Sequence, residues 1–280
     1  MNRFGNHRLT GLGQSEIRAM ITACTRVKGI NLAQGVCDTE VPEPVIRGAK
    51  EAMDKGINSY TRCDGLANLR QALAYKLARE NHIKADPETD ITVSNGATGA
   101  FQCACMALLN PGDEVILFEP YYGYHISTLL AMEAVPRLVP LRGQNWELRM
   151  DDLVQALTDQ TRAIVINTPG NPSGKVFTKQ GLESIAALAQ QQDWLVFTDE
   201  MYEYFLYDQQ EHVSIASLVG MADRTITISG YSKTFSITGW RIGHSVAPAP
   251  YAELIGAVND LLYVCAPAPL QYGVAVAFKN

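Results

Sequence analysis

Seven short runs of apolar, β-branched and aromatic residues recur along the chain, with amphipathic stretches between them. The runs occupy residues 90–94, 114–118, 137–141, 163–167, 194–198, 225–229 and 241–247. Such alternation of strand and helix is typical of a parallel sheet that helices cover on both faces. We therefore expect an α/β fold, with a mainly parallel seven-stranded sheet in an α/β/α sandwich.

Amphipathic periodicity predicts helices between these strands. The expected helices cover residues 44–55, 66–81, 97–109, 122–132 and 179–191. Thr178 precedes the last of them and is a residue type that caps helix N-termini. A further helix-like run at 270–278 has no terminating residue before Asn280, so we expect the chain to be cut short.

Composition excludes several classes of function. The net charge is −6 and no run of Lys or Arg exceeds two residues, so we expect no nucleic-acid partner. No apolar run reaches the roughly 20 residues that span a bilayer, and the N-terminus lacks the apolar stretch of a signal peptide. We expect a cytoplasmic protein with no membrane partner. The six cysteines and five histidines are dispersed without metal-ligand spacing, so no metal site is predicted.

Small or polar residues follow several predicted strands, at the edge where open α/β sheets bind their ligands. The first group is Ser-Asn-Gly-Ala-Thr-Gly at 94–99, which leads into a helix. Free amides and the helix dipole at such a turn favour a phosphate group, although ordinary helix starts share the pattern. The second group is Asn-Thr-Pro-Gly-Asn-Pro-Ser-Gly at 167–174, a rigid turn that presents Asn171.

Two later groups carry ionisable side chains. Asp199 directly follows the fifth run, and Tyr202 comes three residues later. A helix-capping Asp beside a packed Tyr is the purely structural alternative. After the sixth run, Lys233 lies among small, hydroxylated and aromatic residues, with Arg241 eight residues further on. Lysine is uncommon at a buried strand end unless it is paired or reactive, so Lys233 is the candidate reactive group.

Together these motifs resemble those of the class I/II aminotransferases, in the fold-type I family of pyridoxal-phosphate enzymes. The motifs are N-x-x-x-N-P-x-G at 167–174, D-E-x-Y at 199–202 and S-K-x-x-x-x-x-G-x-R at 232–241. The resemblance runs from about residue 32 to the end of the chain. It implies pyridoxal 5'-phosphate as cofactor and the exchange of an amino group between an L-amino acid and a 2-oxo acid. By the same resemblance, residues 1–40 form an N-terminal arm and part of the small domain, and 41–280 form the large cofactor-binding domain.

The resemblance also assigns catalytic roles. Lys233 matches the lysine that forms a Schiff base with the cofactor and later moves a proton between substrate and cofactor. Asp199 matches the carboxylate that pairs with the pyridine nitrogen and keeps it protonated. Asn171 and Tyr202 match the two groups that hydrogen-bond the phenolic oxygen and tune the pKa of the Schiff base.

The remaining contacts surround the cofactor and the substrate. Tyr122 matches the aromatic ring that stacks on the pyridine, with Tyr121 as the alternative one position away. The phosphate contacts implied are Gly96, Ala97, Thr98, Ser232 and Arg241, together with Tyr60 from the neighbouring subunit of a homodimer with shared active sites. Gly35 and Asn171 match residues beside the substrate.

Two questions stay open at this point. Family members continue through a small C-terminal domain whose arginine pairs with the substrate carboxylate; we expect that domain to be missing here, because no residue of the chain matches that arginine. The substrate is also open, although the motif variants look like the branch that acts on methionine, glutamine, kynurenine or aromatic amino acids. The alternatives are another reaction of the same cofactor (a C–S β-lyase, a cyclising synthase or a decarboxylase), a cofactor-binding regulator, or a cofactor-binding but inactive fragment.

Overall fold

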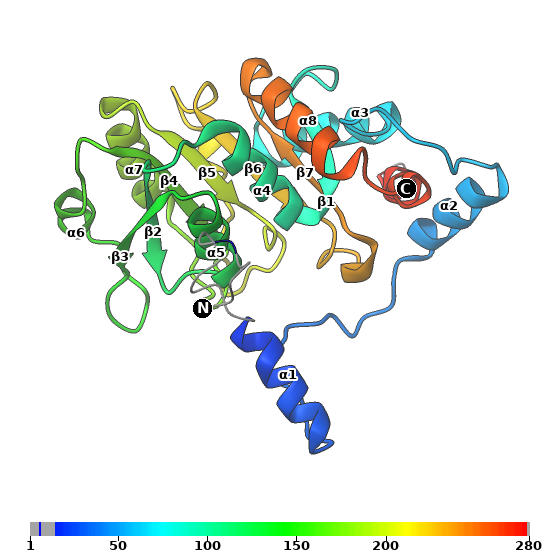
Figure 1. Cartoon of the computed structure of the whole chain (residues 1–280), viewed down its shortest axis with the longest axis horizontal. Helices are drawn as coiled ribbons and strands as arrows, with labels where there is room; N and C mark the ends of the chain where they lie inside the picture. Colours follow the sequence, from blue (N-terminus) through cyan, green and yellow to red (C-terminus); the bar gives the residue numbers. More distant parts are fainter. Residues whose placement is uncertain (1–5, 7–14, 279–280) are drawn as a thin grey trace.

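The computed structural model describes residue 6 and residues 15–278, arranged around one seven-stranded sheet (Figure 1). The strands are β1 (Ile91–Asn95), β2 (Glu114–Glu119), β3 (Val135–Pro140), β4 (Thr161–Asn167), β5 (Leu195–Asp199), β6 (Thr225–Gly230) and β7 (Ile242–Val246). Their order across the sheet is β1-β7-β6-β5-β4-β2-β3. Strands β2 to β6 pair in parallel, whereas β7 runs antiparallel to β1 and to β6. The prediction of a mainly parallel seven-stranded sheet is confirmed.

Helices connect the strands and cover the sheet. They are α1 (Glu16–Arg26), α2 (Glu43–Asp54), α3 (Ala67–Lys76), the π-helix η2 (Leu77–Asn81), α4 (Gly96–Leu108), α5 (Gly123–Ala131), α6 (Met150–Gln155), α7 (Lys179–Gln191), the 3₁₀ turns η3 (Ile215–Ser217) and η4 (Thr238–Trp240), α8 (Ala249–Tyr263) and α9 (Ala268–Ala277). Each predicted helix is present, and the cap of α7 is confirmed because Thr178 Oγ1 accepts a hydrogen bond from the amide of Gly181. The sequence prediction omitted α1, α6 and α8.

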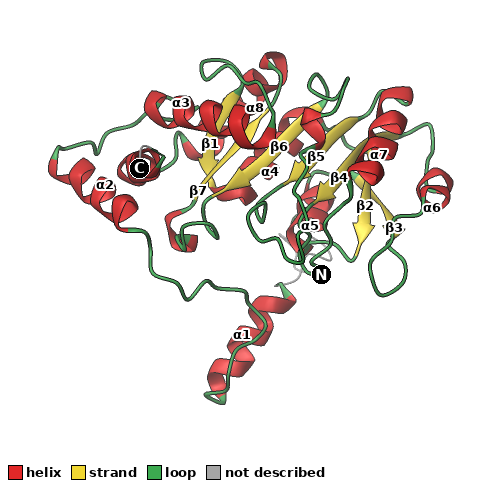
Figure 2. Cartoon of the chain, turned by 180° about the vertical axis from the view of Figure 1, so that it is seen from behind, coloured by secondary structure: helices red, strands yellow, loops and turns green. Residues whose placement is uncertain are grey.

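Alternating side chains of each central strand divide the core into two layers. Val115 and Leu117 of β2 pack with the cluster that contains residues of α4, α5 and α8. Ile116 and Phe118 of the same strand face the opposite cluster, which contains residues of α6 and α7. Burying each such side chain contributes roughly 1.5–3 kcal/mol, so both faces of the sheet are held by helices. Figure 2 shows the same layers from behind.

The C-terminal end of the described chain packs in a third buried cluster, with residues of α2, α3, β1 and β7. Helix α1 stands away from the sheet on an extended segment, while α2 packs against α9 (Figures 1 and 2). A side chain at Gly273 would meet the carbonyl oxygen of Val45 at 2.7 Å, so only glycine permits this approach. Within 15–278, no helix is long and apolar enough to cross a membrane. The division of the chain at about residue 40 stays a prediction.

Candidate functional site

A cavity of about 810 Å³ opens at the carboxyl ends of β4 and β5. Parallel strands end at this edge, so the turns that follow them project their side chains into one space. Most of the residues singled out from the sequence line it: Gly35, Ala97, Thr98, Tyr122, Asn171, Asp199, Tyr202, Ser232, Lys233 and Arg241. The fold therefore brings together residues that are more than 200 positions apart, as the motifs predict.

Asp199 is the last residue of β5 and is almost fully buried, at 8 % exposure. Its Oδ1 accepts a hydrogen bond from the amide of Met201 at 3.1 Å. Its Oδ2 lies 3.0 Å from Nε2 of His125, a buried residue of α5. The carboxylate thus has a fixed orientation at the cavity wall. His125 was not predicted as a site residue, because its contact with Asp199 spans 74 positions and the two residues belong to different motifs.

Polar contacts link the turn after β4 to the turn after β5. Asn167 donates from Nδ2 to the carbonyl oxygen of Asp199 at 3.2 Å and accepts the amide hydrogen of Asn171 at 2.7 Å. Asn171 in turn reaches the hydroxyl of Tyr202, with Nδ2 and the oxygen 3.5 Å apart. Burial, followed by the negative charge of Asp199, raises the pKa of Tyr202. At neutral pH Tyr202 is therefore a neutral phenol that can donate a hydrogen bond.

Lys233 lies in the turn after β6, half-buried at the cavity wall. Its ammonium donates to the carbonyl oxygen of Gly35 at 2.6 Å and lies 6.0 Å from the ring centroid of Tyr202. The Cys37 thiol donates to the carbonyl oxygen of Lys233 at 3.3 Å. The extended segment that contains Gly35 and Cys37 therefore crosses directly over the lysine.

The N-terminus of α4 and the Arg241 guanidinium form a cradle for an anion. Gly96 has φ +73°, and a Cβ there would lie 2.3 Å from Nη2 of Arg241. A Cβ at Gly243 would lie 2.4 Å from the amide nitrogen of Ala97, so β7 also presses against this helix start. Arg241 itself adopts φ +57°, a left-handed conformation that is uncommon outside glycine. Free amides at a helix start beside a guanidinium are a favourable site for a phosphate.

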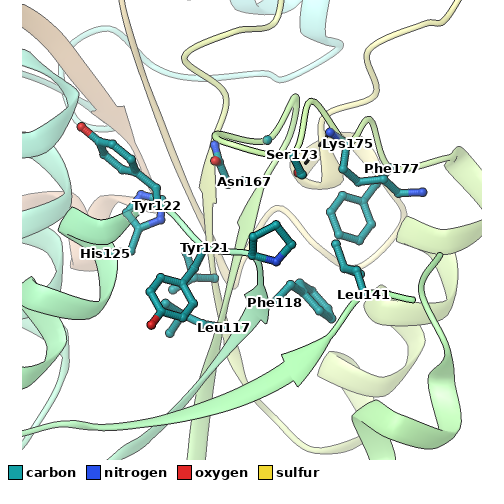
Figure 3. A pocket seen from close by; sticks show the side chains of 13 residues that line it. Leu117, Phe118, Tyr121, Tyr122, His125, Leu141, Asn167, Ser173, Lys175 and Phe177 are labelled. Carbon is teal, nitrogen blue, oxygen red and sulfur yellow. Dashed lines mark hydrogen bonds between the residues drawn. The ribbon is translucent and has the colours of Figure 1, made fainter. Parts of the chain in front are cut away.

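The structure distinguishes Tyr122 from Tyr121. Tyr122 lines the large cavity, and its ring packs edge-on against His125 with 5.2 Å between centroids. Tyr121 does not line the large cavity; it packs against the core and, like Tyr122, lines a second, small cavity of about 20 Å³ (Figure 3). Asn167 lies between the two cavities, and Phe118 and Phe177 line the far wall of the small one. A space of this size holds one water molecule at most.

Two predicted residues do not line the large cavity. Gly96 lies beneath the Arg241 guanidinium instead of at the surface of the cavity. Tyr60 is 81 % exposed, and its contact with a neighbouring subunit stays a prediction. Arg18 and Ile21 of α1 were not predicted, yet they line the cavity on the side of the N-terminal helix.

Comparison with known proteins identifies the family of the chain. The family model for aminotransferases of class I and II matches residues 27–280. An aspartate aminotransferase of Pyrococcus abyssi is 38 % identical over 98 % of this chain, which spans 71 % of that protein. The same values hold for aromatic-amino-acid aminotransferase 2 of Thermococcus litoralis. The structure of N-succinyldiaminopimelate aminotransferase from Mycobacterium tuberculosis superposes with a TM-score of 0.95 at 36 % identity, covering 99 % of this chain and 72 % of that one. On these findings the chain belongs to the class I and II aminotransferases.

Proposed function

We propose that the protein uses pyridoxal 5'-phosphate, attached at Lys233, to exchange an amino group between an L-amino acid and a 2-oxo acid. One observation carries the proposal: Lys233, the Asp199 carboxylate and the Arg241 cradle face the same cavity. Enzymes of this family are generally dependent on this cofactor.

The described residues fit the cofactor at both of its ends. The cradle at Gly96 and Arg241 suits the phosphate. Because Gly96 has no Cβ, the Arg241 guanidinium can lie directly against the start of α4. Asp199 suits the pyridine nitrogen, since its carboxylate is buried and is held by His125 and by the amide of Met201. When bound, the cofactor supplies an electron sink for the charge that develops at the substrate α-carbon. Asp199 stabilises that sink by holding a proton on the ring nitrogen.

Lys233 is proposed to act both as the attachment point and as the base and acid. Its Nζ is held by the carbonyl oxygen of Gly35, so this contact breaks when Lys233 reacts. Once freed by the incoming substrate, Nζ would take the proton from the substrate α-carbon as a base and release it again as an acid. Tyr202 and Asn171 are proposed to donate hydrogen bonds to the phenolic oxygen, a role that the neutral state of Tyr202 permits.

The amino acid is proposed to be one with an apolar or aromatic side chain. Tyr124, Phe205 and Tyr207 line the cavity beyond the cofactor contacts, with the apolar Ile21 of α1 among the lining residues. The relatives named above differ in their substrates, which matches the rule that pocket details decide specificity and the fold does not.

We further propose a homodimer in the cytoplasm. Tyr60 is exposed and does not line its own chain's cavity, so its proposed phosphate contact is to the site of a second copy of the chain. All six cysteines are free thiols, which suits a reducing compartment.

The test is a visible absorption spectrum of the purified protein with cofactor, recorded before and after single amino acids are added. A cofactor band that an amino acid removes and a 2-oxo acid restores supports transamination. Product analysis then separates it from β-lyase, synthase or decarboxylase chemistry, because only transamination yields the 2-oxo acid of the donor intact. A band that no amino acid changes would contradict the proposal.

A further inference from the structure

A buried ionic cluster lies outside the cavity, against the turn that follows β5. Lys76, Asn81 and Glu203 are 2 %, 5 % and 7 % exposed. The Lys76 ammonium donates to Glu203 Oε1 at 2.5 Å and to Asn81 Oδ1 at 2.8 Å. Asn81 donates from Nδ2 to the other oxygen, Oε2, of Glu203 at 2.8 Å. Both carboxylate oxygens are therefore paired, which is the condition for a buried charge to be tolerated.

The π-helix explains how Lys76 and Asn81, five positions apart, both bind the carboxylate of Glu203. In an α-helix, side chains at i and i+5 point roughly 140° apart, because each residue turns the chain by about 100°. Lys76 ends α3 and Asn81 ends η2, which has the wider i→i+5 hydrogen bonding. The wider turn brings both side chains to the face that meets Glu203. Single π-turns of this kind are rare and occur frequently at functional sites.

A second set of contacts holds Tyr204, the next residue of the same turn. The Tyr204 hydroxyl donates to Glu80 Oε2 at 2.5 Å, and Glu80 also belongs to η2. The Lys76 ammonium lies 5.2 Å from the centroid of the Tyr204 ring, within cation–π range. We refer to Lys76, Glu80, Asn81, Glu203 and Tyr204 as the β5 turn clamp. It holds the chain immediately after Tyr202.

The residues of this turn divide between the cavity and its outer side. Asp199, Met201 and Tyr202 line the cavity. Glu200 points away and is 1 % exposed; its Oε1 accepts a hydrogen bond from the Ser214 hydroxyl at 2.7 Å, and its Oε2 lies 3.0 Å from His212 Nε2. The turn is thus anchored from outside at Glu200 and by the clamp.

The alternative interpretation is that Glu200, Glu203 and His212 form a metal site. Ligand atoms of Glu200, Glu203 and His212 lie within 4.8 Å of one another. Lys76 already supplies a positive charge at Glu203, and Glu200 is occupied by the contacts just described. Among the described residues, the cluster is therefore best understood as an internal ion pair and not as a metal site.

We propose that Lys76, Glu203 and Tyr204 are positioning residues for Tyr202: the clamp fixes the turn so that the Tyr202 hydroxyl stays within reach of the cofactor's phenolic oxygen. This rests on the proposed function, because it assigns the clamp a purpose in that site. None of the three residues lines the cavity, so the clamp acts only through the turn.

The experiment uses the cofactor-loaded protein and measures the pH midpoint at which the absorption of the bound cofactor changes. A donor to the phenolic oxygen stabilises negative charge there, so Tyr202→Phe should raise this midpoint by about half a pH unit to one unit, the equivalent of one net hydrogen bond. Lys76→Met combined with Glu203→Met removes both charges together, which avoids leaving one charge buried and unpaired. This double variant should raise the midpoint in the same direction. When combined with Tyr202→Phe, the double variant should raise the midpoint little further, because both changes remove the hydrogen bond from Tyr202 to the phenolic oxygen.

The matched control is Lys179→Met with Glu183→Met on α7, an exposed pair 4.0 Å apart, which should leave the midpoint unchanged. If the double variant does not fold, Tyr204→Phe replaces it, because Tyr204 is 47 % exposed and its substitution strands no charge. Hydrogen exchange of the cofactor-free protein should also show amides 200–204 exchanging roughly tenfold faster in the clamp variants. A folded clamp variant that keeps the parental midpoint would contradict the proposed role of the clamp. So would a rise in the midpoint that adds fully to the rise caused by Tyr202→Phe. A parental protein without any cofactor band would instead overturn the proposed function, and the clamp with it.

Discussion

Nε2 of His125 and Oδ2 of Asp199 lie 3.0 Å apart, and this contact joins α5 to the end of β5 across the wall of the cavity. Both side chains are buried at the cavity wall. Phe101 packs on the His125 ring with 4.6 Å between centroids and fixes its plane. The Asp199 carboxylate is therefore oriented by the amide of Met201 and by His125, a residue that no motif contains.

His125→Ala should lower kcat by roughly tenfold to a hundredfold, the cost of leaving one buried polar partner unsatisfied. KM should change little, because His125 holds Asp199 and does not hold the amino acid. Steady-state kinetics with the identified amino donor measures both constants. His82→Asn, at an exposed histidine outside the cavity, is the comparison; an equal loss of kcat in both variants would contradict the role of His125.

Lys233→Ala should abolish covalent attachment of the cofactor while noncovalent binding persists, because the cradle at Gly96 and Arg241 is unchanged. Borohydride reduction followed by peptide mass spectrometry should find the adduct on Lys233 in the parental protein and nowhere in the variant. Lys175 provides the control, since it lines the adjacent small cavity and its ammonium lies 3.4 Å from the carbonyl oxygen of Asn145. An adduct on Lys175 would show that the attachment site is misassigned.

Gly96→Ala should weaken cofactor binding by at least about tenfold. The added methyl group would lie 2.3 Å from Arg241 Nη2 and would force the guanidinium out of the cradle, and φ of +73° adds backbone strain. Gly123→Ala is the matched control, because nothing lies within 4 Å of a Cβ at that position. Equilibrium titration of the cofactor by fluorescence compares the two variants. If Gly96→Ala bound the cofactor with the parental affinity, the cradle would not be the phosphate site.

The strands were predictable because their chemistry is local. In β2, residues of alternating direction enter two separate core layers, and the requirement for apolar side chains in both layers makes the run visible in the sequence. Helix α8 was not predicted, because Leu254 and Leu261 are exposed at 51 % and 73 % and blur the periodicity that its buried side produces. In α8 the pattern of burial follows from tertiary contacts, which a local pattern does not contain.

The candidate site divides in the same way. Asp199, Lys233 and Arg241 lie at strand ends or in the turn between β6 and β7, at positions that the motif spacing predicts, and all three line the cavity. His125 and the Lys76–Glu203 pair depend on contacts across 74 and 127 positions, and no local pattern specifies such pairs. The π-helix that ends in Asn81 was predicted as ordinary helix for a similar reason: its wider turn is stabilised by Glu203, a residue of another segment.

Stability should rise with pH between about 4 and 6.5 because of His244. Burial lowers the pKa of this histidine to about 3, so the unfolded chain binds a proton there over a pH range in which the folded chain does not. By linkage, each pH unit below the unfolded pKa then costs up to about 1.4 kcal/mol of unfolding free energy. Urea unfolding of the parental protein and of His244→Phe at pH 5 and pH 7.5 measures the difference, which should be smaller in the variant. His82→Asn, at an exposed histidine with φ +56°, is the control and should keep the parental difference.

Tyr60 tests whether the site is shared between two copies of the chain. It is 81 % exposed and lies outside its own chain's cavity, so a lone chain should lose nothing when the hydroxyl is removed. In the proposed homodimer, Tyr60→Phe should weaken cofactor binding several-fold, because one hydrogen bond to the partner's phosphate is lost. Tyr75→Phe, at another exposed tyrosine (65 %), is the control and should bind the cofactor as the parental chain does.

Mixing Tyr60→Phe subunits with Lys233→Ala subunits gives a sharper test. In each mixed dimer, one site has Lys233 and receives an intact Tyr60 from the Lys233→Ala partner. The other site lacks both residues. Half of the sites in mixed dimers should therefore bind the cofactor with parental affinity and covalently. Sedimentation that shows a monomer at cofactor-saturating concentrations, or parental affinity in Tyr60→Phe, would place Tyr60 outside the functional site.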